Sequence, residues 1–166
     1  FAIETNNVEQ LQIEGNASPG IITMPNQSAA IGTKTEAQTI SNTTMVKIEL
    51  NSETHDVQNE FDSTTNFRFT ATNAGKYLAI GRVLWASPVD GQRYQVAIKL
   101  NGGSDKSRQL VNANGTNQFS NPSTPLTISL AASDYLELYV YHNAGADDTI
   151  GYGDTHDNSL FVVKTS

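Results

Sequence analysis

The sequence has no cysteine, and only 16% of its residues are charged. Without cysteine it can form neither disulfides nor thiolate metal sites, and its redox compartment cannot be inferred. No apolar run approaches the roughly 20 residues that a bilayer-spanning helix needs, so we expect no membrane insertion. The formal net charge of −7 argues against nucleic acid as a partner, because its capture needs clustered lysine and arginine.

Long amphipathic helical patterns are also missing. The 166 residues are enough for one domain with a sizeable core, and their polar surface comes largely from Asn, Thr, Ser and Gln. Thr favours strands and Asn suits turns, so this mixture is typical of an all-β protein exposed to the environment. Because the chain opens at Phe1 rather than at a methionine, we expect a fragment or a processed product.

The usual enzyme signatures are absent. The sequence contains neither a G-x-S-x-G elbow nor an H-E-x-x-H zinc motif. The stretch 151–153 lacks the third glycine of a dinucleotide loop, and the stretch 102–104 lacks a Walker lysine. We therefore predict that the protein is not an enzyme.

The stretch from Phe61 to Trp85 predicts two alternating strands joined by a turn at residues 73–75. Side chains in a strand repeat every two residues, so Phe67, Phe69 and Ala71 should share one face of the first strand. The second strand is apolar on both faces except at Arg82. Its two faces carry Tyr77, Ala79, Gly81, Val83 and Trp85 on one side and Leu78, Ile80, Arg82 and Leu84 on the other. One face packs into the core of a sandwich, and we expect the other face to be covered by protein surface from outside that sandwich.

Further strands follow at short spacing, with turns at Asn-Gly and Asp-Gly sequences between them. We predict strands near residues 29–33, 38–40, 44–50, 67–72, 76–87, 93–101, 108–114, 126–130, 135–142, 148–152 and 159–164. With no helices between them, this spacing indicates a sandwich or jelly roll.

One strand places four polar or amphipathic residues on a single face. In YLELYVYH, Leu136, Leu138 and Val140 point one way, and the opposite face carries Tyr135, Glu137, Tyr139 and Tyr141. Tyrosine has a large apolar body and a polar tip, which suits half-buried surfaces and interfaces. Two interpretations stand: a solvated face with cross-strand aromatic pairs, or a subunit contact.

Three blocks of residues resemble the complement C-one-q and tumour necrosis factor (TNF) superfamily of trimeric jelly rolls. The first block is Phe61-Asp62, then F-R-F at 67–69, then G-K-Y at 75–77 before the long apolar strand. The second is LTISLAASDYLELYVY, with Ser133-Asp134 where the family often has Gly-Asp. The third is SLFVV at 159–163, although Leu160-Phe161 replaces the family's Gly-Phe pair.

This resemblance implies a ten-stranded jelly-roll head over residues 24–166 that assembles as a homotrimer. Its three-fold axis would be lined by aromatic and aliphatic side chains. We expect Tyr77, Trp85, Tyr94, Tyr139 and Tyr141 at that interface. Calcium sites known in some family members find no matching acidic positions here, so no metal site is carried over.

The segment 1–23 has a second resemblance. AIETNNVEQLQIEGNASPGI is similar to units that precede the distal domain of phage tail-fibre and tail-spike proteins, matching at Ile3, Thr5, Asn6, Glu9, Leu11, Ile13 and Gly15. Such units stack around a three-fold shaft. The resemblance therefore implies a short shaft-like segment before the head.

Exposed loops are the candidate ligand-binding regions. The residues that we single out there are Asp90, Asp105, Asp154 and His156. The acidic loop from Asp147 to Asp157 could hold calcium, although a solvated loop explains the same residues. His55-Asp56 could be a base with its orienting acid, but neither a nucleophile nor a pocket is evident nearby, which favours a surface loop.

These observations predict a non-enzymatic, trimeric receptor- or ligand-binding head of a viral fibre or similar appendage. It would lie on a virion surface or outside the cell and bind a host-surface receptor or glycan, with no cofactor. The alternative is a carbohydrate-binding or carbohydrate-active β-sandwich. There Trp85 or Tyr152 would stack on a sugar and Asp154 with Asp157 would act on it, although burial in the core also explains Trp85.

Overall fold

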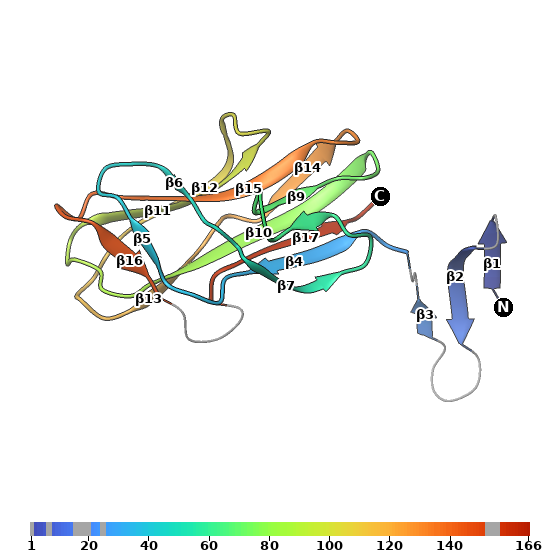
Figure 1. Ribbon diagram of the computed structural model, residues 1–166, viewed down its shortest axis with the longest axis horizontal. Helices are drawn as coiled ribbons and strands as arrows, with labels where there is room; N and C mark the ends of the chain where they lie inside the picture. The colour runs from blue at the N-terminus through green and yellow to red at the C-terminus, as the bar shows by residue number, and fades with distance from the viewer. Residues whose placement is uncertain (1, 6–7, 15–20, 24–25, 152–156) are drawn as a thin grey trace.

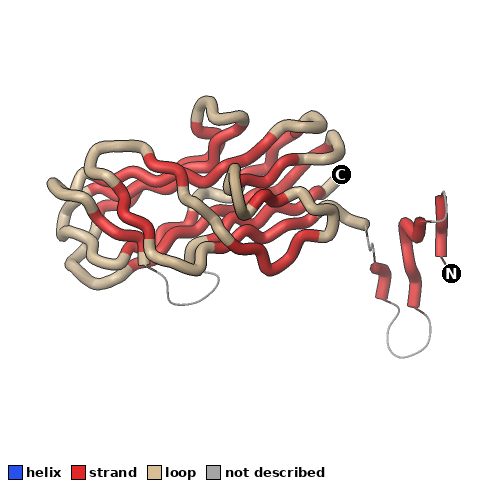
Figure 2. The backbone as a smooth tube through the Cα atoms, viewed as in Figure 1, coloured by secondary structure: helices blue, strands red, loops and turns tan. Residues whose placement is uncertain are grey.

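The computed structural model describes residues 2–5, 8–14, 21–23, 26–151 and 157–166, with side chains in the last two ranges. It is an all-β protein in which two antiparallel sheets pack face to face (Figure 1). Strands dominate and loops gather toward the two ends of the sandwich (Figure 2). The predicted all-β jelly-roll class is confirmed.

The first sheet has eight strands, ordered β5-β16-β10-β17-β4-β7, with β13 and β14 also paired to β10. Its strands are β4 (Ala29–Thr33), β5 (Gln38–Ile40), β7 (Ser52–Asp56), β10 (Gly75–Trp85), β13 (Phe119–Pro122), β14 (Leu126–Leu130), β16 (Asp148–Ile150) and β17 (Ser159–Lys164). The long strand β10 is central, as its apolar character on both faces predicted.

The second sheet has six strands, ordered β12-β11-β15-β9-β8, with β6 paired to β15. They are β6 (Val46–Lys47), β8 (Phe61–Asp62), β9 (Arg68–Thr70), β11 (Arg93–Leu100), β12 (Asp105–Asn112) and β15 (Tyr135–His142). The two sheets thus hold more than the ten strands expected, because short segments such as β5, β6, β8 and β13 pair at their margins.

The N-terminal segment forms a small sheet of its own. Its strands are β1 (Ala2–Thr5), β2 (Val8–Glu14) and β3 (Ile21–Thr23), and the order is β1-β2-β3. None of them pairs with a strand of the sandwich among the described residues. The boundary between a segment 1–23 and a head 24–166 stays a prediction.

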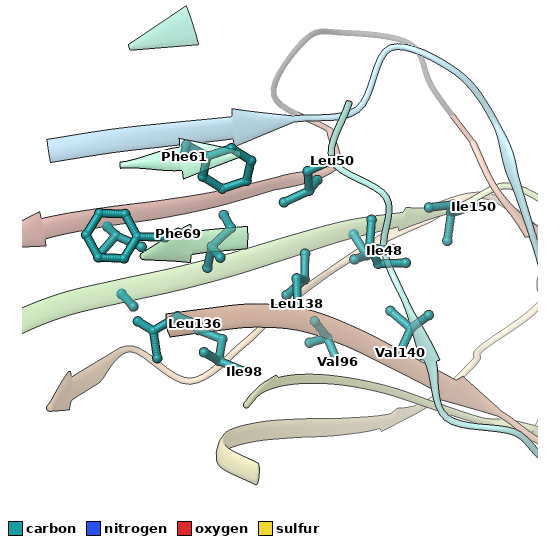
Figure 3. Packing of buried hydrophobic residues seen from close by; sticks show 14 of the residues in the cluster. Ile48, Leu50, Phe61, Phe69, Val96, Ile98, Leu136, Leu138, Val140 and Ile150 are labelled. Carbon is teal, nitrogen blue, oxygen red and sulfur yellow. The ribbon is translucent and has the colours of Figure 1, made fainter. Parts of the chain in front are cut away.

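The core lies between the two sheets and is built from alternate residues of each strand. Figure 3 shows Phe69, Ile98, Leu136 and Leu138 of the six-stranded sheet within the buried cluster that also includes residues of the other sheet. Alternation in β15 is the cause, because Leu136, Leu138 and Val140 are fully buried while Tyr139 and Tyr141 are only half-buried. Each fully buried Leu or Ile stabilises the fold by roughly 1.5–3 kcal/mol.

Backbone geometry explains one of the sequence blocks and corrects the interpretation of another. Ser133 has a φ of 74°, in the left-handed region that favours the glycine often found there in the family. The Asp134 carboxylate accepts hydrogen bonds from the Ala131 amide and the Asn101 side chain, which fixes the turn before β15. Phe67, by contrast, has a φ of 48° and precedes β9, so its predicted place on a common face with Phe69 and Ala71 is wrong.

The first and last strands of the sandwich lie side by side. β4 pairs antiparallel with β17, so Ala29 lies opposite Val163. The Lys164 amide donates to the Ser28 carbonyl at 2.9 Å, and the Lys76 amide donates to the Ser166 carbonyl at 2.7 Å. The start and the end of the head therefore meet at one end of the sandwich (Figure 1).

Candidate subunit interface and ligand-binding loops

The outer face of the eight-stranded sheet carries an apolar strip. Strand alternation places one set of side chains away from the sandwich core on β4, β17 and β10, and this set continues to an exposed valine after β7. We call it the outer strip: Ile31, Val57, Leu78, Ile80, Leu84, Phe161 and Val163. Val57 is 43% exposed, and the other six are half-buried in a single chain.

The register of the strands joins these residues into one surface. Leu78 pairs with Val163 and Ile80 pairs with Phe161 across the β10–β17 ladder, and Phe161 pairs with Ile31 on β4. Directly paired side chains on one face are close enough to touch. The strip is therefore continuous across three strands, and contiguous apolar surface of this kind marks an interaction site.

Arg82 lies between Ile80 and Leu84 on this face of β10, and Lys76 lies on the same face beyond Leu78. Nη2 of Arg82 lies 2.9 Å from Oδ1 of Asp157, which begins the approach to β17. Its Nε is buried and has no hydrogen-bond partner among the described residues. A half-exposed ion pair of this kind contributes little to stability, but it adds a directional contact to an otherwise apolar face.

Three of the five aromatic residues expected at a subunit interface lie in the core instead. Tyr77, Trp85 and Tyr94 are each 0% exposed in a single chain, so they have no surface to offer a partner. They alternate with the outer strip or lie on the facing sheet, and Gly81 between Tyr77 and Trp85 lets Leu138 of the other sheet approach. The prediction for these three residues is wrong, as is the alternative in which Trp85 stacks on a sugar.

Trp85 and Tyr94 belong to a buried aromatic cluster. Their ring centroids are 4.7 Å apart in an edge-to-face arrangement, and the His142 ring lies 5.5 Å from Trp85. The Tyr94 hydroxyl donates to Asp148 at 2.9 Å and accepts from the Val89 amide at 2.8 Å. Burial, with Asp148 nearby, raises the pKa of Tyr94 to about 12. The cluster joins the two sheets and is structural.

Tyr139 and Tyr141 lie on the outer face of the six-stranded sheet, as their alternation predicted. Both are half-buried, and cations lie over both rings: Lys99 Nζ is 4.9 Å from the centroid of Tyr139, and the Arg93 guanidinium is 4.9 Å from that of Tyr141. Burial and the neighbouring Glu137 raise the pKa of Tyr139. This face is polar, and it is opposite to the outer strip.

The structure does not bring the loop candidates together. Asp90 accepts a hydrogen bond from the Gly115 amide at 2.6 Å, at the end of the sandwich where β11 begins. Asp105 lies where β12 begins, after the turn that follows the other end of β11, and its carboxylate is 3.6 Å from Lys99 Nζ. Eight residues of strand separate these ends by roughly 26 Å. Asp154, His156 and Tyr152 lie outside the described residues.

The carboxylates that sequence analysis considered as metal ligands or catalytic groups accept hydrogen bonds from other groups of the protein. Asp147 accepts from the Asn42 amide at 3.0 Å, and Asp148 accepts from Tyr94. Asp56 accepts from the Glu60 and Phe61 amides, while its neighbour His55 is exposed on β7. Within the described ranges, no three His, Asp or Glu side chains are grouped to hold a metal ion. A calcium site in the loop 147–157 stays untested.

An open hollow of about 520 Å³, which the sequence did not reveal, lies beside β8. Its lining includes Glu60 and Asp62, but both carboxylates are engaged with the backbone. Asp62 accepts from the amides of Thr64 and Thr65 at 3.0 and 2.9 Å, and these bonds lower its pKa well below the ordinary range. The hollow is shaped by turn geometry and does not present free ligands.

Comparison with known proteins supports the fold. Over 84% of the chain, the structure is similar to Eiger TNF from S. frugiperda (TM-score 0.59, 93% of that chain covered) and to murine APRIL (TM-score 0.61, 99% covered). Sequence identity is 13% in both cases, so the likeness shows a TNF-like jelly roll and nothing finer.

Sequence comparison finds a bacterial relative. The chain is 30% identical over 139 residues to YqcC, an uncharacterized protein of Bacillus subtilis (strain 168), and it spans 37% of that protein's length. No known protein-family profile matches the chain. Within the described residues, no helix is long and apolar enough to cross a membrane.

Proposed function

We propose that this protein is a non-enzymatic trimerisation and ligand-binding head of a viral (phage) fibre or similar surface appendage, displayed on a virion or outside the cell. The observation that carries the proposal is the outer strip. A single chain leaves its seven apolar side chains partly exposed after the sandwich has closed. Burial of such surface against identical copies gains roughly 25 cal/mol per Å² of apolar area.

Two further features support three-fold assembly. The sequence blocks resemble a family whose jelly rolls assemble as homotrimers, and the fold is TNF-like. In this proposal Phe161 and Leu78 of the outer strip lie at the subunit contact, in place of the aromatic residues expected from the sequence. The segment 1–23 resembles phage shaft units that stack around a three-fold axis. A head joined to such a segment would repeat its binding surface three times, which raises avidity without new contacts.

The non-enzymatic character is supported by how the polar groups are used. Among the described residues, His142 is fully buried and its Nε2 lies 2.9 Å from the Ile40 carbonyl, while Asp148 and Glu60 hold backbone or core partners. In the hollow beside β8 the Ser63 hydroxyl donates to the Glu53 carboxylate at 3.3 Å, and no histidine is among the described residues that line that hollow. The described polar groups therefore serve binding and structure better than turnover.

The oligomeric state tests the proposal. Multi-angle light scattering at micromolar concentration should report three times the 17.9 kDa chain mass. Leu78→Lys places a charge in the outer strip and should reduce the mass to that of one chain. Leu110→Lys is the matched control, because Leu110 is 43% exposed on the other sheet and should leave the trimer intact.

Circular dichroism should first confirm that both variants are folded, so that a change in mass reports on assembly alone. A wild-type protein that stays monomeric would contradict the proposal. So would a Leu78→Lys variant that keeps the wild-type mass, because the strip would then have no part in assembly.

A further inference from the structure

The outer face of the six-stranded sheet concentrates positive charge on an acidic chain. Register and alternation place five of the ten Lys and Arg residues there: Lys47, Arg68, Arg93, Lys99 and Arg108. Three carboxylates share this face. Glu137 is ion-paired with Lys47 at 3.1 Å and Asp105 with Lys99 at 3.6 Å, while Asp62 lies opposite Arg68 in the β8–β9 ladder and accepts hydrogen bonds from the Thr64 and Thr65 amides. The face therefore keeps a net positive charge while the whole chain carries −7.

Tyrosines hold three of these cations in place. The Arg68 guanidinium is 3.9 Å from the ring centroid of Tyr135, and Lys99 and Arg93 lie over Tyr139 and Tyr141. Such contacts fix a long side chain on the sheet without neutralising its charge. No carboxylate lies within ion-pair distance of Arg68 or Arg93 in the described part of the chain. Both guanidinium groups can therefore bind an anion.

We propose that this face binds an acidic polysaccharide, a polymer whose sugars carry carboxylate groups. The spacing of the tyrosines that hold these cations favours it. Along β15 the three tyrosines lie four and two residues apart, which separates their Cα atoms by roughly 13 and 7 Å. Each strand of duplex DNA carries one phosphate per about 3.4 Å of helix axis, which is a denser row of charge than this face presents.

Two other properties of the face agree with a glycan. The surrounding negative charge disfavours dense polyanions at long range, and a flat sheet with tyrosine hydroxyl groups suits an extended, hydroxyl-rich chain. Arg68 and Arg93 can each pair with a carboxylate through two parallel hydrogen bonds. Tyr135 and Tyr141 position these arginines, and the buried Glu137, which is paired with Lys47, lies between the two tyrosines on β15.

This inference rests on the proposed ligand-binding function but not on the trimer. It identifies the ligand class and moves its site from the loops to a sheet face. When three copies pack through the outer strip, the cationic face is on the opposite sheet and stays uncovered. Binding and assembly can therefore be measured separately on the same sample.

Isothermal titration with polygalacturonate in 50 mM NaCl tests the inference, with neutral pullulan as the control polymer. We expect binding of polygalacturonate alone, weakened on going to 200 mM NaCl because released counterions drive it. The double variant Arg68→Gln with Arg93→Gln should raise the Kd at least tenfold. The double variant Lys76→Gln with Lys164→Gln removes the same charge from the other sheet and should change the Kd less than twofold.

Three results would overturn the inference: no heat with polygalacturonate, equal losses in the two double variants, or tighter binding of oligo(dT) than of polygalacturonate. Light scattering on the same samples separates the two proposals. A monomer that binds polygalacturonate through Arg68 and Arg93 supports the glycan face and contradicts the trimer. A trimer that does not bind it does the reverse.

Discussion

The ring of Phe61 on β8 occupies the space where a side chain at Gly32 on β4 would begin. This contact joins the two sheets at the hollow beside β8, and it explains the Phe of the Phe-Asp block that sequence analysis singled out. Gly32 is buried, so neither partner can move into solvent.

We expect Gly32→Ala to destabilise the protein by about 1–3 kcal/mol, because the added methyl group forces Phe61 out of its packed position. Urea denaturation followed by tryptophan fluorescence measures the change. Gly103→Ala is the control, since Gly103 is exposed in a turn, has no positive φ, and its added methyl group would meet only the Leu100 carbonyl oxygen, at 3.3 Å. If both substitutions have the same small effect, the close packing of Phe61 on Gly32 does not matter for stability.

Ser133→Gly should stabilise the protein by about 0.5–1 kcal/mol. The φ of 74° at Ser133 strains an L-residue, and glycine removes that strain at some cost in unfolded-state entropy. Thermal unfolding should show a higher Tm. Ser129→Gly on strand β14 is the comparison, where glycine should destabilise by a similar amount. A lower Tm for Ser133→Gly would show that its left-handed conformation carries no strain.

Tyr94→Phe should reduce stability at pH 7 by about 1–3 kcal/mol, because it leaves the buried Asp148 and the Val89 amide without their partner. The loss should depend on pH. The pKa of Tyr94 is raised from 10.0 to about 12 in the folded chain, so its protonated form is favoured by folding. That contribution is complete below pH 10 and falls by at most about 1.4 kcal/mol per pH unit between pH 10 and pH 12.

Urea midpoints at pH 9 and pH 11.5 measure this dependence. The gap between wild type and Tyr94→Phe should narrow at the higher pH, since the phenylalanine cannot titrate. A constant gap would mean that the hydroxyl keeps its ordinary pKa in the folded protein.

Asp62→Asn should destabilise the protein at pH 7 and destabilise it less at pH 2.5. The amides of Thr65 and Thr64 donate to the Asp62 carboxylate and lower its pKa below the ordinary 3.8. A lowered pKa contributes stability that is complete above pH 3.8 and is lost as the pH falls toward the folded-state value. Urea midpoints at the two pH values check this, with Asp90→Asn as the control carboxylate in another turn. A difference from wild type that is as large at pH 2.5 as at pH 7 would contradict it.

Period-two alternation predicted most of the long strands, because each carries a continuous apolar face. The same rule could not decide which face of β10 enters the core, since both are apolar. The missed signal lay in Ala79 and Gly81, which share a face with Tyr77 and Trp85. Small residues between large ones allow the opposite sheet to approach, here through Leu138.

Besides the two-residue strand β8, two strands of the sandwich escaped the sequence analysis, for different reasons. β7 (Ser52–Asp56) is polar on both faces because it lies at the edge of its sheet, so it has no alternation to detect. β13 (Phe119–Pro122) ends in a proline and contains Asn121, so its sequence is typical of a loop. The cation–tyrosine pairs were also hidden, because Arg68 and Tyr135 are far apart in sequence and meet only through the β9–β15 ladder.

Because Ser28 and Lys164 are hydrogen-bonded neighbours, anything covalently joined before β4 is attached at the end of the sandwich where β17 finishes. The turns around Asp90, Gly115 and Asn143 are at the far tip, beyond Trp85. A stalk attached at the near end would leave those turns at the end of the sandwich farthest from the stalk. Peptide tags appended after Ser166 should then stay clear of that tip.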